Sequence, residues 1–317
     1  MVAAPWHPVE ACDLPPLARW QIRPPGTKPR GTARLRLRAA KTAYALIHRR
    51  LGVAASGRLK IRDRGGRIAS IPIDAANGAW IDFESRRRYG GYAPAATLFF
   101  RSVAARAETV YDIGANWGYF TTLLAANRDF AGHVYAFEIA RRNFVDLARI
   151  VAVAGLKQWA TPLPFGISDV DGKIKIVDDP NGHLSRVRRP GDSVRGRDAE
   201  VRRLDTLDLP LPQFIKIDAE GHDARVLAGG RTLIAKARPV ILFESQWAAE
   251  ADMRPAFDLL ADLGYQTFAL DDQTAERALH LSPLTFVDRL GIAASIDVVA
   301  THPQASLDRF VRALVAG

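Results

Sequence analysis

The chain has 317 residues, of which 48% are hydrophobic, and it carries a formal net charge of +10. This length and apolar content are sufficient for a full hydrophobic core in one large domain or two smaller ones, and no apolar run reaches the roughly 18–20 residues that span a bilayer. The first residues lack the basic stretch and apolar core of a secretory signal. One cysteine, Cys12, excludes an internal disulfide and a thiolate zinc cluster, so a cytoplasmic protein is expected.

The positive charge is concentrated in the N-terminal part of the chain. Residues 1–70 hold 15 Lys and Arg against 3 Asp and Glu, which leaves 29 of the 44 basic and 31 of the 34 acidic residues for the remainder. Two interpretations stay open. The basic residues form a solvated tail, or they contact an anionic surface such as a phospholipid headgroup, an acidic glycan or nucleic acid.

Residues 1–75 are predicted to form a basic extension in front of a main domain over 76–317. Seven prolines predict an extended arm over 1–31. A helix is expected over 33–52, with Thr32 as its cap and Gly52 as its stop, and its arginines fall on more than one face, which argues against a helix lying in a membrane. Residues 58–73 alternate on both sides of Gly65-Gly66 and predict a hairpin.

The main domain shows a regular alternation of strand and helix patterns. After a helix predicted over 89–106, apolar β-rich runs occur at 109–113, 133–137, 160–167, 213–217, 239–243, 264–270 and 295–300. Helical stretches separate many of them, at 119–130, 141–155, 223–237 and 253–264. This alternation predicts a mostly parallel sheet covered on both faces. Residues 178–207, rich in Gly, Pro and Arg, break the rhythm and are placed as a loop that could cover the top of the sheet.

The run 109–113 leads into a turn with the sequence DIGANWG. Gly114 and Gly118 let the backbone approach a ligand or adopt a positive φ. The spacing differs from the G-x-G-x-x-G of pyrophosphate binders, and Asp112 would repel a phosphate but attract a cation. S-adenosylmethionine (SAM), which has an ammonium and a sulfonium and no phosphate, is therefore the predicted ligand. The alternative is an ordinary strand-to-helix turn.

The next run ends in Glu138, 20 positions after Gly118. This is close to the spacing at which a carboxylate reaches the hydroxyls of a bound ribose. The alternative for Glu138 is a surface residue at the end of a strand.

Titratable side chains follow two later runs, with Asp218, Glu220 and His222 after 213–217 and Glu244 after 239–243. Groups crowded on one rim shift each other's pKa and suit proton transfer. His222 is the predicted base for methyl transfer to an oxygen, and Asp218 would orient it or bind the acceptor hydroxyl. Two alternatives stay open: these residues cap and pack the following helix, or Asp218, Glu220 and Glu244 hold a divalent metal. The pattern does not demand a metal, and none is predicted.

These segments together resemble one family. The sequences VYDIGANWGYFT, YAFEIARRNF and FIKIDAEGHDARVLAGG with RPVILFE resemble the FkbM-type methyltransferases, a branch of the SAM-dependent class I fold. The resemblance extends from about Tyr89 to Glu244, and GISDVDGKIKI and EVRRLDTL are similar to two smaller pieces of the family pattern. It implies an α/β fold with a Rossmann-like class I methyltransferase sheet, in addition to the basic N-terminal extension with its helix and hairpin.

The resemblance implies an O-methyltransferase that uses SAM, releases S-adenosylhomocysteine and acts on a hydroxyl of a sugar, glycan or glycolipid, or secondary metabolite. The residues that it assigns to the methionine end of SAM are Asp112, Gly114, Ala115, Asn116 and Gly118. Glu138 is assigned to the ribose, and Ser168 and Asp169 to the surroundings of the adenine. Lys216, Asp218, Glu220 and His222 form the acceptor side.

The chain departs from the family pattern in three respects. Asp223 stands where a Glu is common, the usual Pro after the F-E pair is missing, and the segments 1–75 and 178–203 lie outside the pattern. We expect these two segments to select the substrate. Arginines of the second would hold an anionic group of the acceptor if it folds over the site; otherwise they are a solvated loop. They are Arg186, Arg188, Arg189, Arg195, Arg197, Arg202 and Arg203.

Three rival functions were weighed against this interpretation. A nucleic-acid methyltransferase would carry an N/D-P-P-Y/F turn where this chain has DAEGHD, so nucleic acid is not the expected partner. A nicotinamide-dependent oxidoreductase is disfavoured by Asp112 and a missing glycine. A non-catalytic SAM-fold module remains an alternative. The expected partners are the acceptor and, through the basic segment, a membrane surface; a homo-oligomer is compatible with the sequence.

Overall fold

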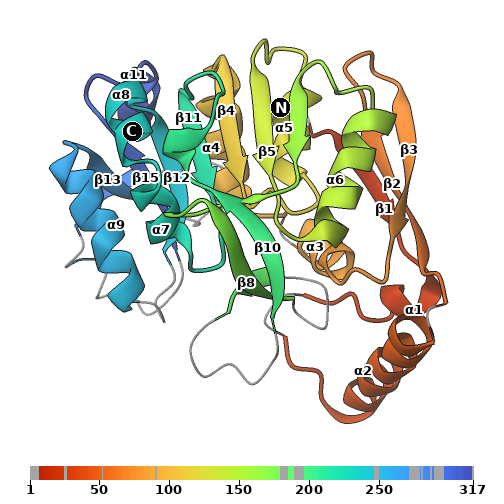
Figure 1. Cartoon of the computed structure of the whole chain (residues 1–317). Helices are drawn as coiled ribbons and strands as arrows, with labels where there is room; N and C mark the ends of the chain where they lie inside the picture. The colour runs from red at the N-terminus through yellow and green to blue at the C-terminus, as the bar shows by residue number, and fades with distance from the viewer. Residues whose placement is uncertain are drawn as a thin grey trace.

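The computed structural model describes residues 7–24, 27–51, 53–89, 91–178, 185–188, 196–245, 250–270, 279, 281–285, 288 and 296–315. Its centre is an eight-stranded, mostly parallel sheet with helices on both faces (Figure 1). In these ranges, no helix combines the length and the apolar character needed to cross a membrane. The predicted α/β class is confirmed.

The strand order in the central sheet is β14-β13-β15-β12-β11-β4-β5-β6. Five neighbouring strands, from β6 to β12, run parallel, whereas β15 is antiparallel to both of its neighbours. All seven apolar runs predicted from the sequence form strands. They are β4 (Thr109–Ile113), β5 (His133–Phe137), β6 (Ala160–Leu163) with β7 (Gly166–Ile167), β11 (Phe214–Ile217), β12 (Val240–Ser245), β13 (Gln266–Leu270) and β15 (Ile296–Thr301), and β14 (Leu281–Pro283) adds an edge.

The direction of the chain across the sheet changes at β4. From β4 the chain moves outward through β5 and β6, and it then returns to β11 on the other side of β4. In open α/β sheets, ligands bind beyond the carboxyl ends of the strands at such a switch point. The turn after β4 and the segment after β11 meet here, because the Asp218 amide donates a hydrogen bond to the Ile113 carbonyl at 3.0 Å.

Side chains alternate between two cores along each strand. Val110 of β4 packs on one face, and Tyr111 and Ile113 pack on the other. The first face is covered by α4 (Pro94–Ser102), α5 (Tyr119–Ala125), α6 (Arg141–Val153) and α11 (Asp308–Val315), and the second by α7 (Asp223–Ala228), α8 (Arg231–Ala237) and α9 (Glu250–Asp262).

The single helix predicted over 223–237 is wrong in one respect, because Gly229-Gly230 divides it into α7 and α8.

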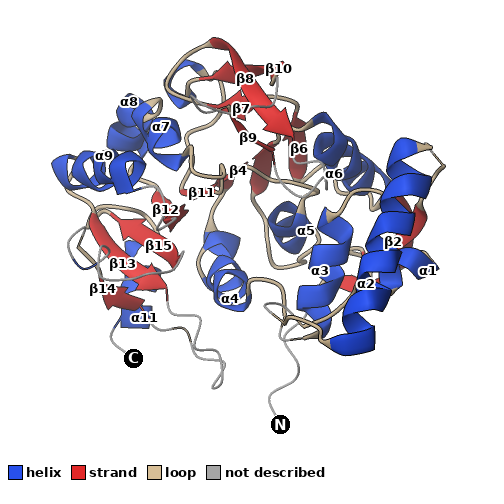
Figure 2. Ribbon diagram, turned by 90° about the horizontal axis from the view of Figure 1, so that it is seen from below, coloured by secondary structure: helices blue, strands red, loops and turns tan. Residues whose placement is uncertain are grey.

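A second, smaller sheet has the order β7-β10-β8-β9. It contains β8 (Gly172–Asp178), β9 (Ser185–Val187) and β10 (Arg197–Arg202), followed by a helical turn at Leu204–Thr206 (Figure 2). The segment 178–207 was expected to be a loop, so the strands β9 and β10 correct this prediction. Their pairing with β8 is what turns this polar segment into sheet.

The N-terminal extension is folded over its described residues. The predicted hairpin is confirmed as β2 (Ser56–Arg62) and β3 (Ile68–Asp74). The prediction of an extended arm over 1–31 is wrong at two places. Strand β1 (Val9–Asp13) pairs with β2, and Pro16–Arg19 form the short helix α1. Helix α2 (Gly31–Tyr44) continues into a π-helical turn (Ala45–Arg50) and is followed later by α3 (Ala79–Arg88). Its N-cap is Arg30, so Thr32 is not the cap, and Gly52 lies outside the described residues.

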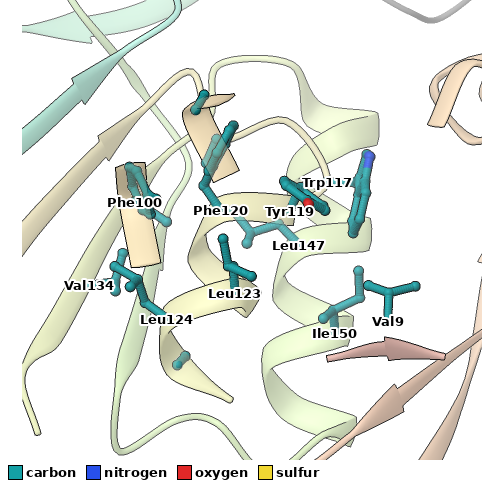
Figure 3. Close-up of a cluster of buried hydrophobic side chains, with 14 of the residues drawn as sticks. Val9, Phe100, Trp117, Tyr119, Phe120, Leu123, Leu124, Val134, Leu147 and Ile150 are labelled. Atoms are coloured by element: carbon teal, nitrogen blue, oxygen red, sulfur yellow. The ribbon is translucent and has the colours of Figure 1, made fainter. Parts of the chain in front are cut away.

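The extension shares its core with the main domain. One continuous cluster of buried apolar side chains runs from β1 through α6 to α11. Figure 3 shows Val9 of β1 beside Ile150 of α6, in the same cluster as Trp117 and Leu147. The extension therefore packs directly against the helices that follow β4 and β5.

Candidate active site

The turn after β4 depends on its glycines for both conformation and packing. Gly114 has φ +73°, and a Cβ there would lie 1.9 Å from the carbonyl oxygen of Asp218. Gly118 has φ +93°, and a Cβ there would lie 2.4 Å from Cδ1 of Leu147. Asn116 also has a positive φ, of 53°, and its side-chain oxygen accepts a hydrogen bond from the Trp117 amide at 2.8 Å. No other residue type fits the two glycine positions without displacing its neighbours.

Asp112 lies beneath this turn and is completely buried. Its Oδ2 accepts a hydrogen bond from the hydroxyl of Thr121 at 2.7 Å. Its Oδ1 has no hydrogen-bond partner among the residues that the structure describes. A buried carboxylate oxygen without a donor costs free energy, so this atom is suited to accept a hydrogen bond from a ligand.

Lys216 compensates part of this buried charge. It stands opposite Asp112 in the β11–β4 register, is only 5% exposed, and places its Nζ 3.7 Å from Asp112 Oδ1 and 3.3 Å from Asp218 Oδ2. Burial lowers the pKa of Lys216, but Asp218 and Asp112 raise it above its ordinary value, so the side chain is a cation. Lys216 thus connects the end of β4, where the glycine turn begins, with the rim after β11. Its assignment to the acceptor side stays a prediction.

Glu138 is held at the end of β5 by two backbone amides. The amide of Asn116 donates to its Oε2 at 2.7 Å, and the amide of Ala140 donates to its Oε1 at 2.6 Å. Burial raises the pKa of Glu138 to about 7, against the effect of these two hydrogen bonds. The carboxylate links the turn after β4 to the loop after β5.

Ser168 and His222 come together although 54 positions separate them in the sequence. The Ser168 hydroxyl lies 2.8 Å from His222 Nε2 and donates to Asp169 Oδ1 at 3.1 Å. Asp169 in turn pairs with Arg225 at 3.2 Å. The residue predicted as the base is therefore oriented by a residue predicted to lie near the adenine, and the two sets adjoin.

Acidic side chains line the rim after β11 and β12. Glu220, with a φ of 53°, has a pKa raised to about 8 by burial and by the neighbouring Asp218 and Glu244. The pKa of Asp223, which is 1% exposed, is raised to about 7 by burial and by Asp218. Glu244 is half-buried. In the described ranges no group of three His, Cys, Asp or Glu is arranged to hold a metal ion.

These elements surround one pocket. It is lined by Gly114, Asn116, Glu138, Arg186, Asp218, Glu220 and His222, all of which the sequence singled out. Its lining also includes Asn143, a polar residue that the sequence analysis missed. The apolar lining was missed: Ile139 from the loop after β5, and Ile167, Ile174, Ile176, Val187 and Val201 from the small sheet. The alternation of Ile174 and Ile176 along one strand was the available signal, because it places both on the same face.

The arginines that were predicted to form a lid have different surroundings in the structure. Arg186 lines this pocket, and Arg188 lines a second, wider cleft beside it that also includes Ser168, His222 and Arg225. Arg202 and Arg203 do not belong to a lid, because they pair with Glu200 at 2.8 Å and Asp171 at 3.0 Å. Arg197 donates to the Ile139 carbonyl at 3.3 Å, and Arg189 and Arg195 lie outside the described residues.

Comparison with known proteins finds one matching family model. Residues 112–267 match the family model described as the methyltransferase FkbM domain. Solved structures with a similar chain course include an FkbM methyltransferase from Methylobacillus flagellatus KT, at 19% identity and a TM-score of 0.43, over 65% of this chain and 48% of that chain. This chain therefore covers about half the length of that protein. None of the curated proteins compared with the chain matches it.

Two O-methyltransferases are also among the similar structures. One is TomG from Streptomyces achromogenes, involved in tomaymycin synthesis and solved with SAM, at 14% identity, a TM-score of 0.41 and coverage of 72% of this chain and 87% of that chain. The other is an O-methyltransferase from Bacillus cereus in complex with SAH, at 13% identity, a TM-score of 0.38 and coverage of 66% and 79%.

Proposed function

Because this chain carries a methyltransferase domain of the FkbM family over residues 112–267, we propose that it uses SAM to methylate a hydroxyl oxygen of a sugar, glycan or glycolipid, or secondary metabolite. The observation that carries the cofactor part is the buried Oδ1 of Asp112, which has no hydrogen-bond donor among the described residues. An ammonium group would supply both a donor and a positive charge at this atom. A phosphate would be repelled by it.

The remaining pocket residues fit the other parts of SAM. Glu138 offers its carboxylate to a ribose diol, and the apolar side chains of the small sheet, Ile174 and Ile176 among them, form a surface for a flat base. When bound, SAM supplies an electrophilic methyl group on a positively charged sulfur.

Methyl transfer to an oxygen needs a group that accepts the hydroxyl proton. A bound SAM would give its methyl group to the acceptor oxygen and leave as S-adenosylhomocysteine, and the hydroxyl proton would pass to a side chain of the enzyme. His222 is oriented for this role by Ser168. Glu220 is the second candidate, because burial and the neighbouring carboxylates raise its pKa to about 8, so its deprotonated form is a stronger base than an ordinary carboxylate.

The test is a calorimetric titration with SAM and with S-adenosylhomocysteine, followed by transfer of a labelled methyl group to a panel of hydroxyl compounds. Asp112→Asn should lower SAM affinity about tenfold or more, because a charge-assisted hydrogen bond is lost. Asp208→Asn, at an exposed position away from the pocket, is the matched control. Absence of SAM binding, or equal binding by both variants, would refute the cofactor site. Transfer that survives EDTA would exclude a required metal.

A further inference from the structure

Helix α2 and the π-helical turn after it present an exposed apolar stripe. Leu35, Ala39, Thr42 and Leu46 are spaced four, three and four residues apart, so they share one side of the helix. All four are exposed, Leu35 by 66% and Leu46 by 47%. The opposite side, with Tyr44 and Ala40, is buried against the protein.

Cationic side chains flank this stripe on both sides. At 100° per residue, Arg34 and Arg38 lie on one flank of Leu35 and Arg36 lies on the other. All three are exposed, and residues 14–62 contain no Asp or Glu to neutralise them. In the sequence, arginines fall on more than one face of this helix, which argues against a helix that lies in a membrane. The structure removes that objection, because long arginine side chains on both flanks can extend past an apolar stripe toward phosphate groups.

Further apolar side chains are exposed close to this helix in the chain. Five of the eleven large hydrophobic side chains that the structure describes as exposed fall between residues 20 and 53, so they are concentrated rather than scattered. Besides Leu35 and Leu46 they are Trp20 (70%), Leu51 (64%) and Val53 (50%). Helix α2 also lies at one end of the molecule, away from the central sheet, where a flat surface can reach it (Figure 1).

We propose that α2 docks this protein on the surface of a lipid bilayer that contains anionic phospholipid, with Leu35 and Leu46 at the level of the acyl boundary and the flanking arginines at the phosphates. An amphipathic helix of this kind lies in the interface, and each adjacent cation adds electrostatic attraction to the lipid surface. A nucleic-acid surface would use the arginines but would give no reason for an exposed leucine stripe between them. This proposal does not depend on the proposed methyl transfer.

The primary test is sedimentation of the full chain with vesicles of phosphatidylcholine alone or of phosphatidylcholine and phosphatidylglycerol in equal parts. We expect binding to the mixed vesicles to be at least about tenfold tighter, and to weaken as NaCl is raised. Leu35→Ser/Leu46→Ser should lose about tenfold or more of this binding. The matched control is Val153→Ser/Leu211→Ser, because both are exposed apolar residues elsewhere on the protein. Equal binding by the two double variants would overturn the proposal.

A second measurement locates the contact and does not depend on affinity. Cys12 is the chain's one cysteine and is 4% exposed, so a thiol-directed fluorophore on Thr42→Cys marks the stripe alone. Its emission should shift to the blue on anionic vesicles and be quenched by nitroxide-labelled lipid. The same dye on Ala235→Cys, at an exposed position of α8, should not respond. No response at position 42, or an equal response at both, would overturn the docking surface.

Binding to a nucleic-acid duplex tests the remaining explanation, that the surface recognises any anion by charge. If the surface recognises anions by charge alone, the duplex will bind as tightly as the mixed vesicles, and Leu35→Ser/Leu46→Ser will bind both as well as the unaltered chain does. That pair of results would contradict lipid docking. A melting temperature and a SAM affinity equal to those of the unaltered chain show that the variants are folded.

Discussion

Lys216→Met is the substitution with the largest consequence that the site geometry predicts. It removes the cation that lies 3.7 Å from the completely buried Asp112. Removing one partner of a buried ion pair costs about 3–5 kcal/mol, because the remaining charge keeps its desolvation penalty without compensation. At about 2–4 °C for each kcal/mol in a large domain, the ligand-free protein should melt roughly 10 °C lower.

Binding of SAM should reverse part of the stability that Lys216→Met loses. If the ammonium group of SAM docks at Asp112 Oδ1, it supplies the missing cation, so SAM should raise the melting temperature of Lys216→Met more than it raises that of the unaltered protein. Thermal unfolding monitored by circular dichroism, with and without saturating SAM, measures both effects. The control is Lys236→Met, at an exposed lysine. It should change the free energy of unfolding by no more than about 0.5 kcal/mol, both without SAM and with it.

A double variant measures the interaction between Asp112 and Lys216. Asp112→Asn/Lys216→Met removes both charges, so it should be less destabilised than the two single variants added together, by about 1–3 kcal/mol. The reasoning fails if Lys216→Met loses less than about 1 kcal/mol of stability. It also fails if the losses simply add, since Lys216 would then contribute through its aliphatic packing and not through its charge.

Three further predictions follow from the site and one from the extension. Gly114→Ala should abolish SAM binding in calorimetry, because its Cβ would lie 1.9 Å from the Asp218 carbonyl oxygen. The raised pKa of Asp223, about 7, predicts that unfolding free energy measured in urea falls as pH rises from about 4 to 7, because the folded protein holds that proton more tightly; Asp223→Asn should flatten the profile. His222→Gln should leave SAM affinity within about threefold and lower methyl transfer to an identified acceptor by about 10²–10⁴-fold. Deletion of residues 1–14 should cost several kcal/mol in thermal unfolding, since it removes buried side chains such as Leu14 at about 1.5–3 kcal/mol each.

The strands and the turn after β4 were predictable because their signals are local. Each apolar run is bounded by glycine or polar residues, and the spacing of Asp112, Gly114 and Gly118 places a carboxylate and two special backbone positions within seven residues. The glycine pair Gly229-Gly230, which ends α7, is also a local signal in the sequence. The reason that a glycine is needed at Gly229 is not local, because a Cβ there would lie 1.9 Å from the Ser168 carbonyl oxygen, 61 positions away in the sequence.

The electrostatic partners were not predictable because strand register decides them. Lys216 meets Asp112 only when β11 pairs with β4 in the observed register. Likewise β1 was hidden between prolines, and its pairing with Leu59 and its neighbours on β2 is a long-range contact that no local pattern reveals. The contact of Ser168 with His222 has the same origin, since it depends on how the small sheet and α7 meet at the rim of the pocket.

The extension contacts the turn after β4 directly, and this decides how the proposed membrane docking and the proposed methyl transfer can be separated. His7 hydrogen-bonds the Tyr119 hydroxyl at 2.9 Å, and Tyr119 is the residue after Gly118. Asn77, two residues after the end of the extension, donates to the side chain of Asn143 at 2.8 Å, and Asn143 lines the pocket. Truncating the extension would therefore disturb SAM binding even if its role were docking alone. Substitutions confined to the exposed stripe of α2 avoid these contacts, so only they can show whether docking changes transfer to a lipid-linked acceptor while transfer to a free one stays the same.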